Sequence, residues 1–285
     1  MSDLLWKPDK SAYSNSAIKN FSDIINNRHG INFDEYEDLW QWSIKEPQKF
    51  WSALIQYLDI HCSGQIDPVI NKDELIYDQK FFPNLSLNYA ENIILNLNST
   101  PIIFINEKGF RQEISKEEII TKVSRLSSYL RSIGIRKGDR VVAIAANTPN
   151  TLISFLAVNT IGAIWSSCSP DFGEAAILDR FNQIEPTVLL YSEMYFYGGK
   201  KFNIRDKVFN VINEMKTLKK SLCINYQDEK EEDIGKDIID INSIFNDENL
   251  SEELVFETCS FNDPMYILYS SGTTGKPKCI VHNIG

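Results

Sequence analysis

The stretch RVVAIAANTPNTLISFLAVNTIGAIWSSC, residues 140–168, decides the fold class. It reads as a buried strand RVVAIAA, a turn NTPN, a helix TLISFLAVNTIG and a second strand AIWSSC. A loop SPDFG, a helix EAAILDRFNQI and a strand TVLLYS then repeat the pattern. Apolar strands separated by helices of this length predict an α/β fold, with parallel-rich sheets covered by helices on both faces. Right-handed crossovers place the strand-to-helix loops along one edge of such a sheet, where ligands bind.

Residues 1–90 read as a helical segment that precedes this α/β pattern. Within INFDEYEDLWQWSIKEPQKFWSALIQYL, residues 31–58, apolar side chains recur at helical spacing, and Pro47 suits the first turn of a second helix. An aromatic face at this spacing is more typical of core packing than of a binding surface. Its members are Tyr36, Leu39, Trp40, Phe50, Trp51, Leu54, Ile55 and Leu58.

A hairpin and a long helix are predicted between these two regions. PIIFINEKGFRQEI, residues 101–114, reads as two short strands around a glycine-containing turn. Ser115 and Glu118 form a capping box, which begins a helix. Gly134 ends this helix directly after its last apolar position, Ile133.

Composition and charge exclude several classes of protein. The chain has 285 residues, of which 24% are charged, and 29 Lys plus Arg against 39 Asp plus Glu give a net charge of -10. This balance supplies no electrostatic footprint for a nucleic-acid backbone, so we expect no nucleic-acid partner. The N-terminus lacks a secretory signal pattern, and the most apolar helical stretch, residues 152–165, is interrupted by polar side chains. We therefore expect a cytoplasmic protein without a membrane span.

The cysteines and histidines do not form a metal-site pattern. The five cysteines lie far apart without a CxxC pair, and the chain has three histidines. His61 and Cys62 are adjacent, but four ligands are hard to assemble around them, so no metal-ligating residue is predicted. Cys168 has no histidine near it in the sequence, which argues against a cysteine nucleophile.

A second informative stretch is PMYILYSSGTTGKPK, residues 264–278. The short apolar strand PMYILY runs directly into a loop that is rich in glycine, hydroxyl groups and lysine. The P-loop of many nucleotide-binding proteins requires GxxxxGK followed by serine or threonine. Here two residues separate Gly272 from Gly275, and Pro277 follows Lys276 without supplying a hydroxyl for a metal ion. The loop is therefore not a P-loop.

The glycine loop nevertheless has the composition of a phosphate cradle. Its glycines let backbone N–H groups point inward as an anion nest, and its hydroxyls and lysines add donors and positive charge. A plain glycine-rich turn would explain the glycines but not the hydroxyls and lysines in the same place. The predicted polyphosphate site comprises Ser270, Ser271, Gly272, Thr273, Thr274, Gly275, Lys276, Pro277 and Lys278.

SSGTTGKPK resembles the phosphate-binding signature of the adenylate-forming ligases, the AMP-dependent superfamily that includes acyl-CoA synthetases and luciferases. LLWKP at residues 4–8, the segment 36–51 that ends in KFW, and GAIWSSCSPDFGEAAILDRFNQIEP at residues 162–186 are similar to the acetoacetate-activating members. The likeness covers essentially the whole chain. It implies that residues 1–90 form the helical N-terminal cap of an acyl-CoA synthetase. Residues 91–285 would form the first portion of its adenylation domain, truncated after the phosphate loop.

The resemblance implies an acid-thiol ligase. Acetoacetate would attack the α-phosphorus of MgATP to give an acyl-adenylate and pyrophosphate, and the thiol of coenzyme A would then displace AMP. ATP, Mg²⁺ and coenzyme A are thus the implied cosubstrates, and the glycine loop would hold the ATP phosphates, where charge develops on pyrophosphate. Acetate, propionate or butyrate in place of acetoacetate, or a non-catalytic nucleotide-binding remnant, are the alternatives.

A second glycine segment bears on coenzyme A. The segment YGGK, which begins at Tyr197, resembles an Arg-Gly-Gly-Lys segment of the related acetyl-CoA synthetases that contacts coenzyme A. Tyrosine replaces the arginine here, so positive charge for a phosphate would come from the lysine. The alternative is a plain Gly-Gly turn before the helix near Arg205. The candidate coenzyme A contacts are Gly198, Gly199 and Lys200.

Two further segments adjoin the predicted ligand edge. WSSCSPDF, residues 165–172, lies at a strand end, where either a ligand contact or packing of the next helix would explain it, and packing is favoured. His282 lies beside the glycine loop, but no feature of the sequence requires it to contact phosphate.

Members of this superfamily extend far beyond the glycine loop. The resemblance therefore implies an N-terminal fragment that does not catalyse the reaction alone and lacks the catalytic, adenine-pocket and acyl-pocket residues. We expect an incomplete sheet with a parallel edge and apolar faces uncovered, and a strand PMYILY without its next neighbour. The oligomeric state is not predicted.

Overall fold

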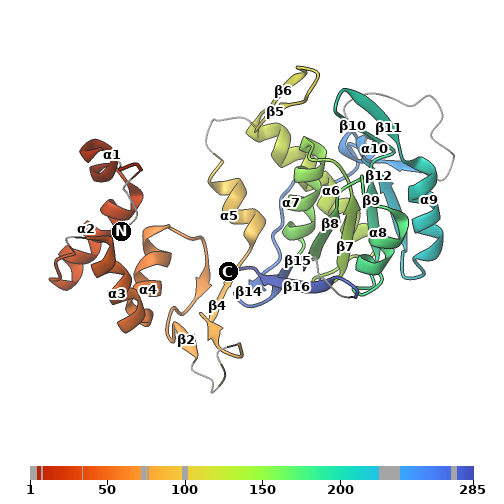
Figure 1. The fold of residues 1–285 in the computed structure, drawn as a ribbon. Helices are drawn as coiled ribbons and strands as arrows, with labels where there is room; N and C mark the ends of the chain where they lie inside the picture. The colour runs from red at the N-terminus through yellow and green to blue at the C-terminus, as the bar shows by residue number, and fades with distance from the viewer. Residues whose placement is uncertain are drawn as a thin grey trace. The chain divides into compact units, whose positions relative to one another are not determined.

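The computed structural model describes residues 5–7, 9–33, 35–71, 75, 77–97, 102–224, 238–270 and 275–285. The chain divides into two compact units, Met1–Leu85 and Ser86–Gly285. The first unit is mainly helical, and the second contains a sheet with helices on its faces (Figure 1).

Short helices dominate the first unit. Its elements are α1 (Lys10–Ser14), α2 (Ala17–His29), α3 (Tyr36–Lys45), α4 (Pro47–Tyr57), β1 (Ser63–Gly64), β2 (Ile70–Asn71) and β3 (Lys80–Phe81). Ser16 begins α2 by accepting a hydrogen bond from the Lys19 backbone N–H, and Gly30 ends it in the left-handed conformation. Pro47 is the first residue of α4, as predicted. Strands β2 and β3 pair antiparallel.

An aromatic core joins these helices, but it uses a different face of α3 from the predicted one. Leu39 and Trp42 are buried. Tyr36, Trp40, Trp51 and Leu58 are 62, 43, 38 and 54% exposed, so the prediction that these four are core side chains is wrong. The apolar face of α3 is centred on the pair Leu39 and Trp42, and Trp42 packs edge-on against Phe50 of α4 with ring centroids 6.2 Å apart.

A parallel-rich sheet forms the centre of the second unit. Its strands are β7 (Arg140–Ile144), β8 (Ile164–Cys168), β9 (Val188–Tyr191), β12 (Lys220–Cys223), β13 (Ile239–Asp240), β15 (Pro264–Ser270) and β16 (Lys278–Asn283). Among the described residues the order is β13-β12-β9-β7-β8-β15-β16. Neighbours pair parallel from β13 to β15, and β16 pairs antiparallel with β15. The predicted α/β fold is confirmed.

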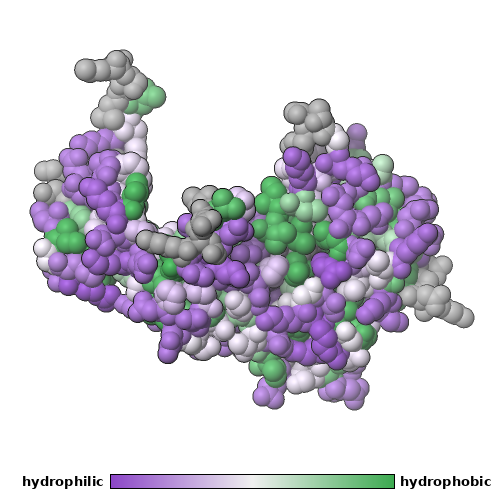
Figure 2. Space-filling model, turned by 90° about the horizontal axis from the view of Figure 1, so that it is seen from below, coloured by the Kyte–Doolittle hydropathy of each residue, from purple (hydrophilic) through white to green (hydrophobic). Residues whose placement is uncertain are grey.

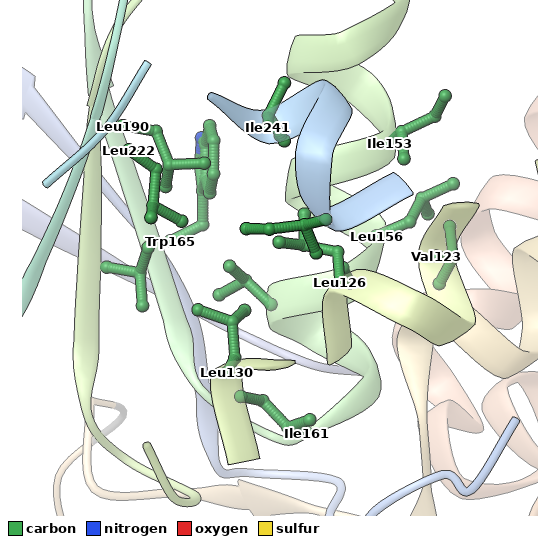
Figure 3. Packing of buried hydrophobic residues seen from close by; sticks show 14 of the residues in the cluster. Val123, Leu126, Leu130, Ile153, Leu156, Ile161, Trp165, Leu190, Leu222 and Ile241 are labelled. Atoms are coloured by element: carbon green, nitrogen blue, oxygen red, sulfur yellow. The ribbon is translucent and has the colours of Figure 1, made fainter. Parts of the chain in front are cut away.

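Helices cover both faces of this sheet. Val141 and Ala143 belong to one buried cluster, whereas Val142 and Ile144 belong to another, because successive side chains of a strand point to opposite faces. Figure 3 shows the first cluster, in which helix side chains such as Leu126 and Leu156 meet Leu190 and other strand residues. The helices of the first face are α5 (Tyr89–Leu95), α6 (Lys116–Ser132), α7 (Pro149–Thr160) and α10 (Ile241–Phe245), and those of the second are α8 (Glu174–Phe181) and α9 (Arg205–Glu214).

Besides the main sheet, the described part of the second unit contains three antiparallel pairings. They are β5 (Ile102–Ile105) with β6 (Arg111–Ile114), β10 (Met194–Tyr197) with β11 (Lys200–Asn203), and β14 (Cys259–Ser260) with β4 (Leu85–Leu87). The first is the predicted hairpin, and α6 follows it. The Ser115 hydroxyl accepts the Glu118 backbone N–H at the start of α6, which is the first of the two bonds of the predicted capping box. Gly134 follows the end of α6 with a φ of +88°.

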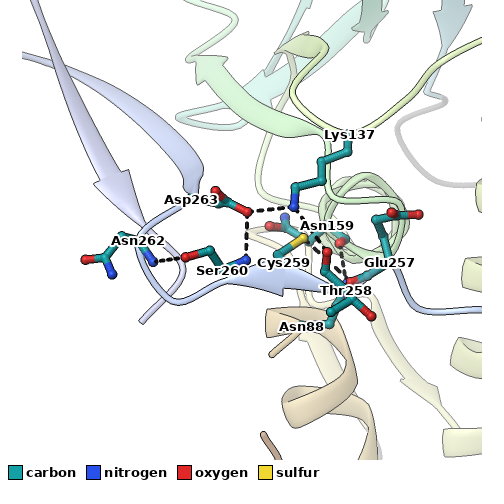
Figure 4. A network of polar contacts seen from close by, with 9 residues as sticks. All are labelled: Asn88, Lys137, Asn159, Glu257, Thr258, Cys259, Ser260, Asn262 and Asp263. Carbon is teal, nitrogen blue, oxygen red and sulfur yellow. Dashed lines mark hydrogen bonds and ion pairs between the residues drawn. The ribbon is translucent and has the colours of Figure 1, made fainter. Parts of the chain in front are cut away.

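A buried asparagine fastens the segment that leads into β15 (Figure 4). Asn88, 2% exposed, donates its side-chain N–H groups to the carbonyls of Asn159, Thr160 and Glu257 at 3.0, 3.2 and 2.9 Å. Lys137 adds an ion pair of 2.7 Å with Asp263, and this hydrogen bond raises the pKa of Lys137. Because a buried amide without partners would be costly, these bonds hold the entry to β15 in place.

The outer end of the sheet differs from the prediction. The strand PMYILY has a neighbour on each side: β8, which is parallel, and β16, which pairs from Tyr266↔His282 to Ser270↔Lys278. The chain turns back after the glycine loop, so no parallel edge is left at this end among the described residues. Apolar side chains are exposed on these strands, with Leu268, Ile280 and Val281 at 40, 43 and 52%. Figure 2 shows apolar residues gathered on one face of the second unit.

Candidate functional site

Two loops lie at the carboxyl edge of the sheet. Strands β8 and β15 are parallel neighbours, with Trp165 opposite Tyr266, so their carboxyl ends lie at the same edge (Figure 1). The loop SPDFG follows β8, and the glycine loop follows β15. This is the edge at which open α/β sheets bind ligands.

The glycine loop connects β15 to β16 as a hairpin. Ser270 and Lys278, the two ends of the loop, pair across the ladder. Gly275 has a φ of +91°, a conformation that favours glycine. Lys276 and Lys278 are exposed. Four members of the predicted site, Ser271, Gly272, Thr273 and Thr274, lie outside the described residues.

Helix α8 supports the second half of this loop. The Asp179 carboxylate lies 3.6 Å from Lys276 Nζ, and both side chains are largely exposed. The Gln183 side-chain amide, just beyond α8, donates to the Pro277 carbonyl at 2.9 Å. The Cys279 thiol lies 3.8 Å from Gln183 Oε1. The loop is thus attached to a helix almost one hundred residues earlier in the chain.

Polar contacts also hold the strand β15, which leads into the loop. The Ser166 hydroxyl of β8 donates to the Ile267 carbonyl at 2.8 Å and lies 3.2 Å from the Tyr269 hydroxyl. Burial raises the pKa of Tyr269, so its phenol stays neutral even at alkaline pH. Burial likewise raises the pKa of the Cys168 thiol to about 12. A thiol that stays protonated is a poor nucleophile, which agrees with the expectation that Cys168 does not act as one.

The SPDFG loop is held by cations from two helices. Lys207 of α9 donates to the carbonyls of Pro170 and Phe172 at 2.6 and 2.8 Å, and burial lowers the pKa of Lys207. Arg180 of α8 lies over the Phe172 ring, 4.7 Å from its centroid. Trp165 is 3% exposed and belongs to the core cluster on the first face. The packing interpretation of the WSSCSPDF segment therefore holds for Trp165, Pro170 and Phe172.

The candidate coenzyme A residues lie on the β10–β11 hairpin rather than on the main sheet. Tyr197 pairs with Lys200, so Gly198 and Gly199 form a two-residue turn, and their φ values of +57° and +76° fit the type I′ turn that such hairpins favour. The Gly199 N–H donates to the Glu107 carboxylate at 3.0 Å. The Glu107 carboxylate thus already accepts from the Gly199 N–H, a donor that a phosphate could otherwise use.

No local signal in the sequence points to several of these contacts. Asp179, Gln183 and Lys207 are ordinary polar residues of helical segments, and their partners lie far away in the chain. Only the adjacency of β8 and β15, which brings α8 beside the glycine loop, could have pointed to the first two. His282 is exposed and pairs with Tyr266, toward the end of β16 that lies away from the loop.

Within the described ranges, no group of three or more His, Cys, Asp or Glu side chains is placed to hold a metal ion. No helix in that part of the chain is both long enough and apolar enough to cross a bilayer.

Comparison with known proteins links both units to one family. The sequence model of the AMP-binding enzymes matches residues 99–285, and that of the acetyl-coenzyme A synthetase N-terminus matches residues 36–93. The chain is 36% identical to acetoacetyl-CoA synthetase of Gallus gallus over its whole length and to acetoacetyl-coenzyme A synthetase of Rhizobium meliloti over 99% of it. A malonamoyl-CoA synthetase of Penicillium aethiopicum is 30% identical over 98% of the chain.

A solved structure extends the likeness to the fold. The acetoacetyl-CoA synthetase from Streptomyces lividans matches with a TM-score of 0.92 and 31% identity, over 100% of this chain and 44% of that one. The chain also spans 44% of the Gallus gallus relative and 43% of the Rhizobium meliloti relative, less than half of each. The family model covers well over half of the chain, which therefore belongs to the AMP-binding enzyme family.

Proposed function

We propose that this chain is the first part of an ATP-dependent acetoacetate–CoA ligase. The observation that carries the proposal is the loop SSGTTGKPK at the carboxyl edge of a parallel sheet, in a chain 36% identical throughout to an acetoacetyl-CoA synthetase. In the proposed reaction, acetoacetate and ATP give an acyl-adenylate and pyrophosphate, and coenzyme A then displaces AMP to form the thioester.

The chemistry of the loop suits the first step. A carboxylate oxygen attacks the α-phosphorus, the bond to the bridging oxygen of pyrophosphate breaks, and negative charge grows on that leaving group. The backbone N–H of the positive-φ Gly275, the Ser270 hydroxyl and the ammonium groups of Lys276 and Lys278 would bind this charge. Phosphoryl and nucleotidyl transfer depend mainly on such positioning and charge stabilisation.

Mg²⁺ would enter this site with ATP. A carboxylate that contacts the described part of the loop is that of Asp179, and it already faces Lys276. One exposed carboxylate is a poor site for a metal that demands six oxygen ligands, so the phosphates of ATP would supply most of them. We therefore assign no metal-ligating residue to this chain.

Coenzyme A is proposed to use the turn at Gly198, Gly199 and Lys200 in the second step. The left-handed turn and Lys200 offer an N–H donor and a cation on the surface. Tyr197 in place of arginine and Glu107 on the Gly199 N–H both weaken the attraction of this turn for phosphate. We therefore propose that this turn makes only a small contribution and that coenzyme A binds mainly through other contacts.

The remaining assignments follow from the same relatives. We propose that residues 1–90 are the N-terminal cap, that residues 91–285 begin the adenylation domain, and that the protein acts in the cytoplasm on small molecules. Since the chain spans less than half of its relatives, we propose that it does not complete the reaction alone. The malonamoyl-CoA synthetase among its relatives favours one second candidate, a CoA ligase for another short acid.

Exchange of labelled pyrophosphate into ATP tests the proposal. The complete reading frame that contains residues 1–285 should catalyse exchange with acetoacetate and much less with acetate, propionate or butyrate. A preference for one of these other acids would replace acetoacetate as the substrate. Exchange by the 285-residue chain itself would contradict the claim that it is inactive alone.

A further inference from the structure

The end of α8 contacts both sides of the glycine loop. On the incoming side, the Arg180 guanidinium lies 5.8 Å from the ring centroid of Tyr269, the residue before Ser270. On the outgoing side, Asp179 faces Lys276 and Gln183 bonds to the Pro277 carbonyl. These three side chains come from one short segment, so a single rigid element sets where both ends of the loop lie.

Gln183 acts as the anchor in this arrangement. Its side-chain nitrogen donates to the Asp179 carbonyl at 2.6 Å and to the Pro277 carbonyl at 2.9 Å, which uses both of its N–H groups. Pro277 has a fixed φ, so an anchor on its carbonyl also restricts the neighbouring Lys276. The amide therefore ties the outgoing end of the loop to the last turn of α8.

Asp179 and Lys276 form a weaker and replaceable contact. Their atoms are 3.6 Å apart, and the side chains are 45% and 73% exposed. Ion pairs between exposed groups are worth little, because water screens the charges and ordering two side chains costs entropy. A polyphosphate carries several negative charges, so it would outcompete one carboxylate for the ammonium group.

We propose that Gln183 is a positioning residue for the phosphate loop and that Asp179 holds Lys276 until a polyphosphate takes that lysine over. The proposal rests on the proposed function, because it assumes that the loop binds the phosphates of ATP. It gives a role to Asp179 of α8 and to Gln183 of the segment after α8, neither of which stands out in the sequence.

The charge half of the proposal is tested with inorganic tripolyphosphate titrated calorimetrically into the 285-residue chain. Asp179→Asn removes the competing charge, so tripolyphosphate should bind about two- to five-fold more tightly, the range expected for release of an exposed ion pair. Glu174→Gln is the matched control, since it removes one charge from the same helix and keeps an acceptor for Asn210. Equal affinities of Asp179→Asn and wild type, or an equal gain in Glu174→Gln, would overturn the role of Asp179.

The anchor half is tested with Gln183→Met, which keeps the length of the side chain but removes its donors. Tripolyphosphate should bind about five-fold more weakly, as expected for one lost hydrogen bond. In the double variant Asp179→Asn/Gln183→Met the gain from Asp179→Asn should disappear, because Lys276 is no longer placed. A purely structural role would lower thermal stability and leave that gain intact, and this outcome would overturn the anchor.

The same titrations separate this inference from the proposed function. If the wild-type chain binds neither tripolyphosphate nor MgATP, the ATP site is wrong and the roles of Asp179 and Gln183 fall with it. If the wild-type chain binds both and the variants match it, the ATP site stands and the inference alone is wrong.

Discussion

The molecule carries two glycine turns with nearby lysines, and their surroundings differ. The loop between β15 and β16 lies at the carboxyl edge of the main sheet. Asp179 of α8 and Gln183, just beyond α8, contact the part of this loop that leads into β16. The turn between β10 and β11 belongs to a separate hairpin, and Glu107 already occupies its Gly199 N–H. A glycine turn with nearby lysines can therefore stand in very different surroundings, and its sequence alone does not show how well it would bind an anion. The element that supports the turn, and the charges already facing it, distinguish the two.

The largest difference is expected when one lysine is removed from each turn. Lys276→Ala should weaken binding of tripolyphosphate about ten-fold or more, because hydrogen bonds to charged groups contribute about 1.5–3 kcal/mol. Lys200→Ala should leave that affinity unchanged. Calorimetric titration of both variants measures the contrast, and equal losses would remove the distinction between the two turns.

Glycine substitutions should separate backbone strain from binding. Gly199 and Gly275 have φ values of +76° and +91°, and an added Cβ would meet no heavy atom within 4 Å at either position. Gly199→Ala and Gly275→Ala should therefore each lower the free energy of unfolding by about 1 kcal/mol through left-handed strain alone. Urea denaturation measures this loss. Tripolyphosphate affinity should fall in Gly275→Ala and stay constant in Gly199→Ala, and the reverse pattern would exchange the roles of the turns.

A smaller effect is expected at the coenzyme A turn. Glu107→Ala frees the Gly199 N–H and removes a negative charge, so coenzyme A should bind about two- to five-fold more tightly. Glu113→Gln on strand β6 of the neighbouring hairpin is the control for a general change of charge. No gain in Glu107→Ala would mean that coenzyme A does not use this donor, and the assignment of Gly198, Gly199 and Lys200 would be withdrawn.

Much of the fold could be predicted because the core of the second unit is local in sequence. The segment RVVAIAA became β7 over Arg140–Ile144, and AIWSSC became β8 over Ile164–Cys168, since each is a run of apolar residues between polar turns. The helix between them, α7, begins at Pro149 and is buried along most of its length. A short run of apolar residues between polar turns is typical of a strand in a parallel sheet that is covered on both faces, so these strands could be predicted.

The parts that escaped prediction depend on contacts between distant residues. The face of α3 was misread because Trp40 and Trp42 are equally apolar, and only packing against α4 selects Trp42. The return strand β16 was not foreseen because its residues are largely exposed and follow a loop rather than an apolar run. In the candidate site, the glycine loop was visible in sequence, whereas Gln183 has meaning only once Pro277 lies beside it.

A crystal structure of the 285-residue chain with bound MgATP tests the central claim most directly. We expect the β- and γ-phosphates within about 3 Å of backbone N–H groups and lysine nitrogens of residues 270–278, the distance of a charge-assisted hydrogen bond. Lys276 should have left Asp179, and Gln183 should still hold the Pro277 carbonyl. Phosphates bound at the β10–β11 turn, or anywhere other than the glycine loop, would contradict the account.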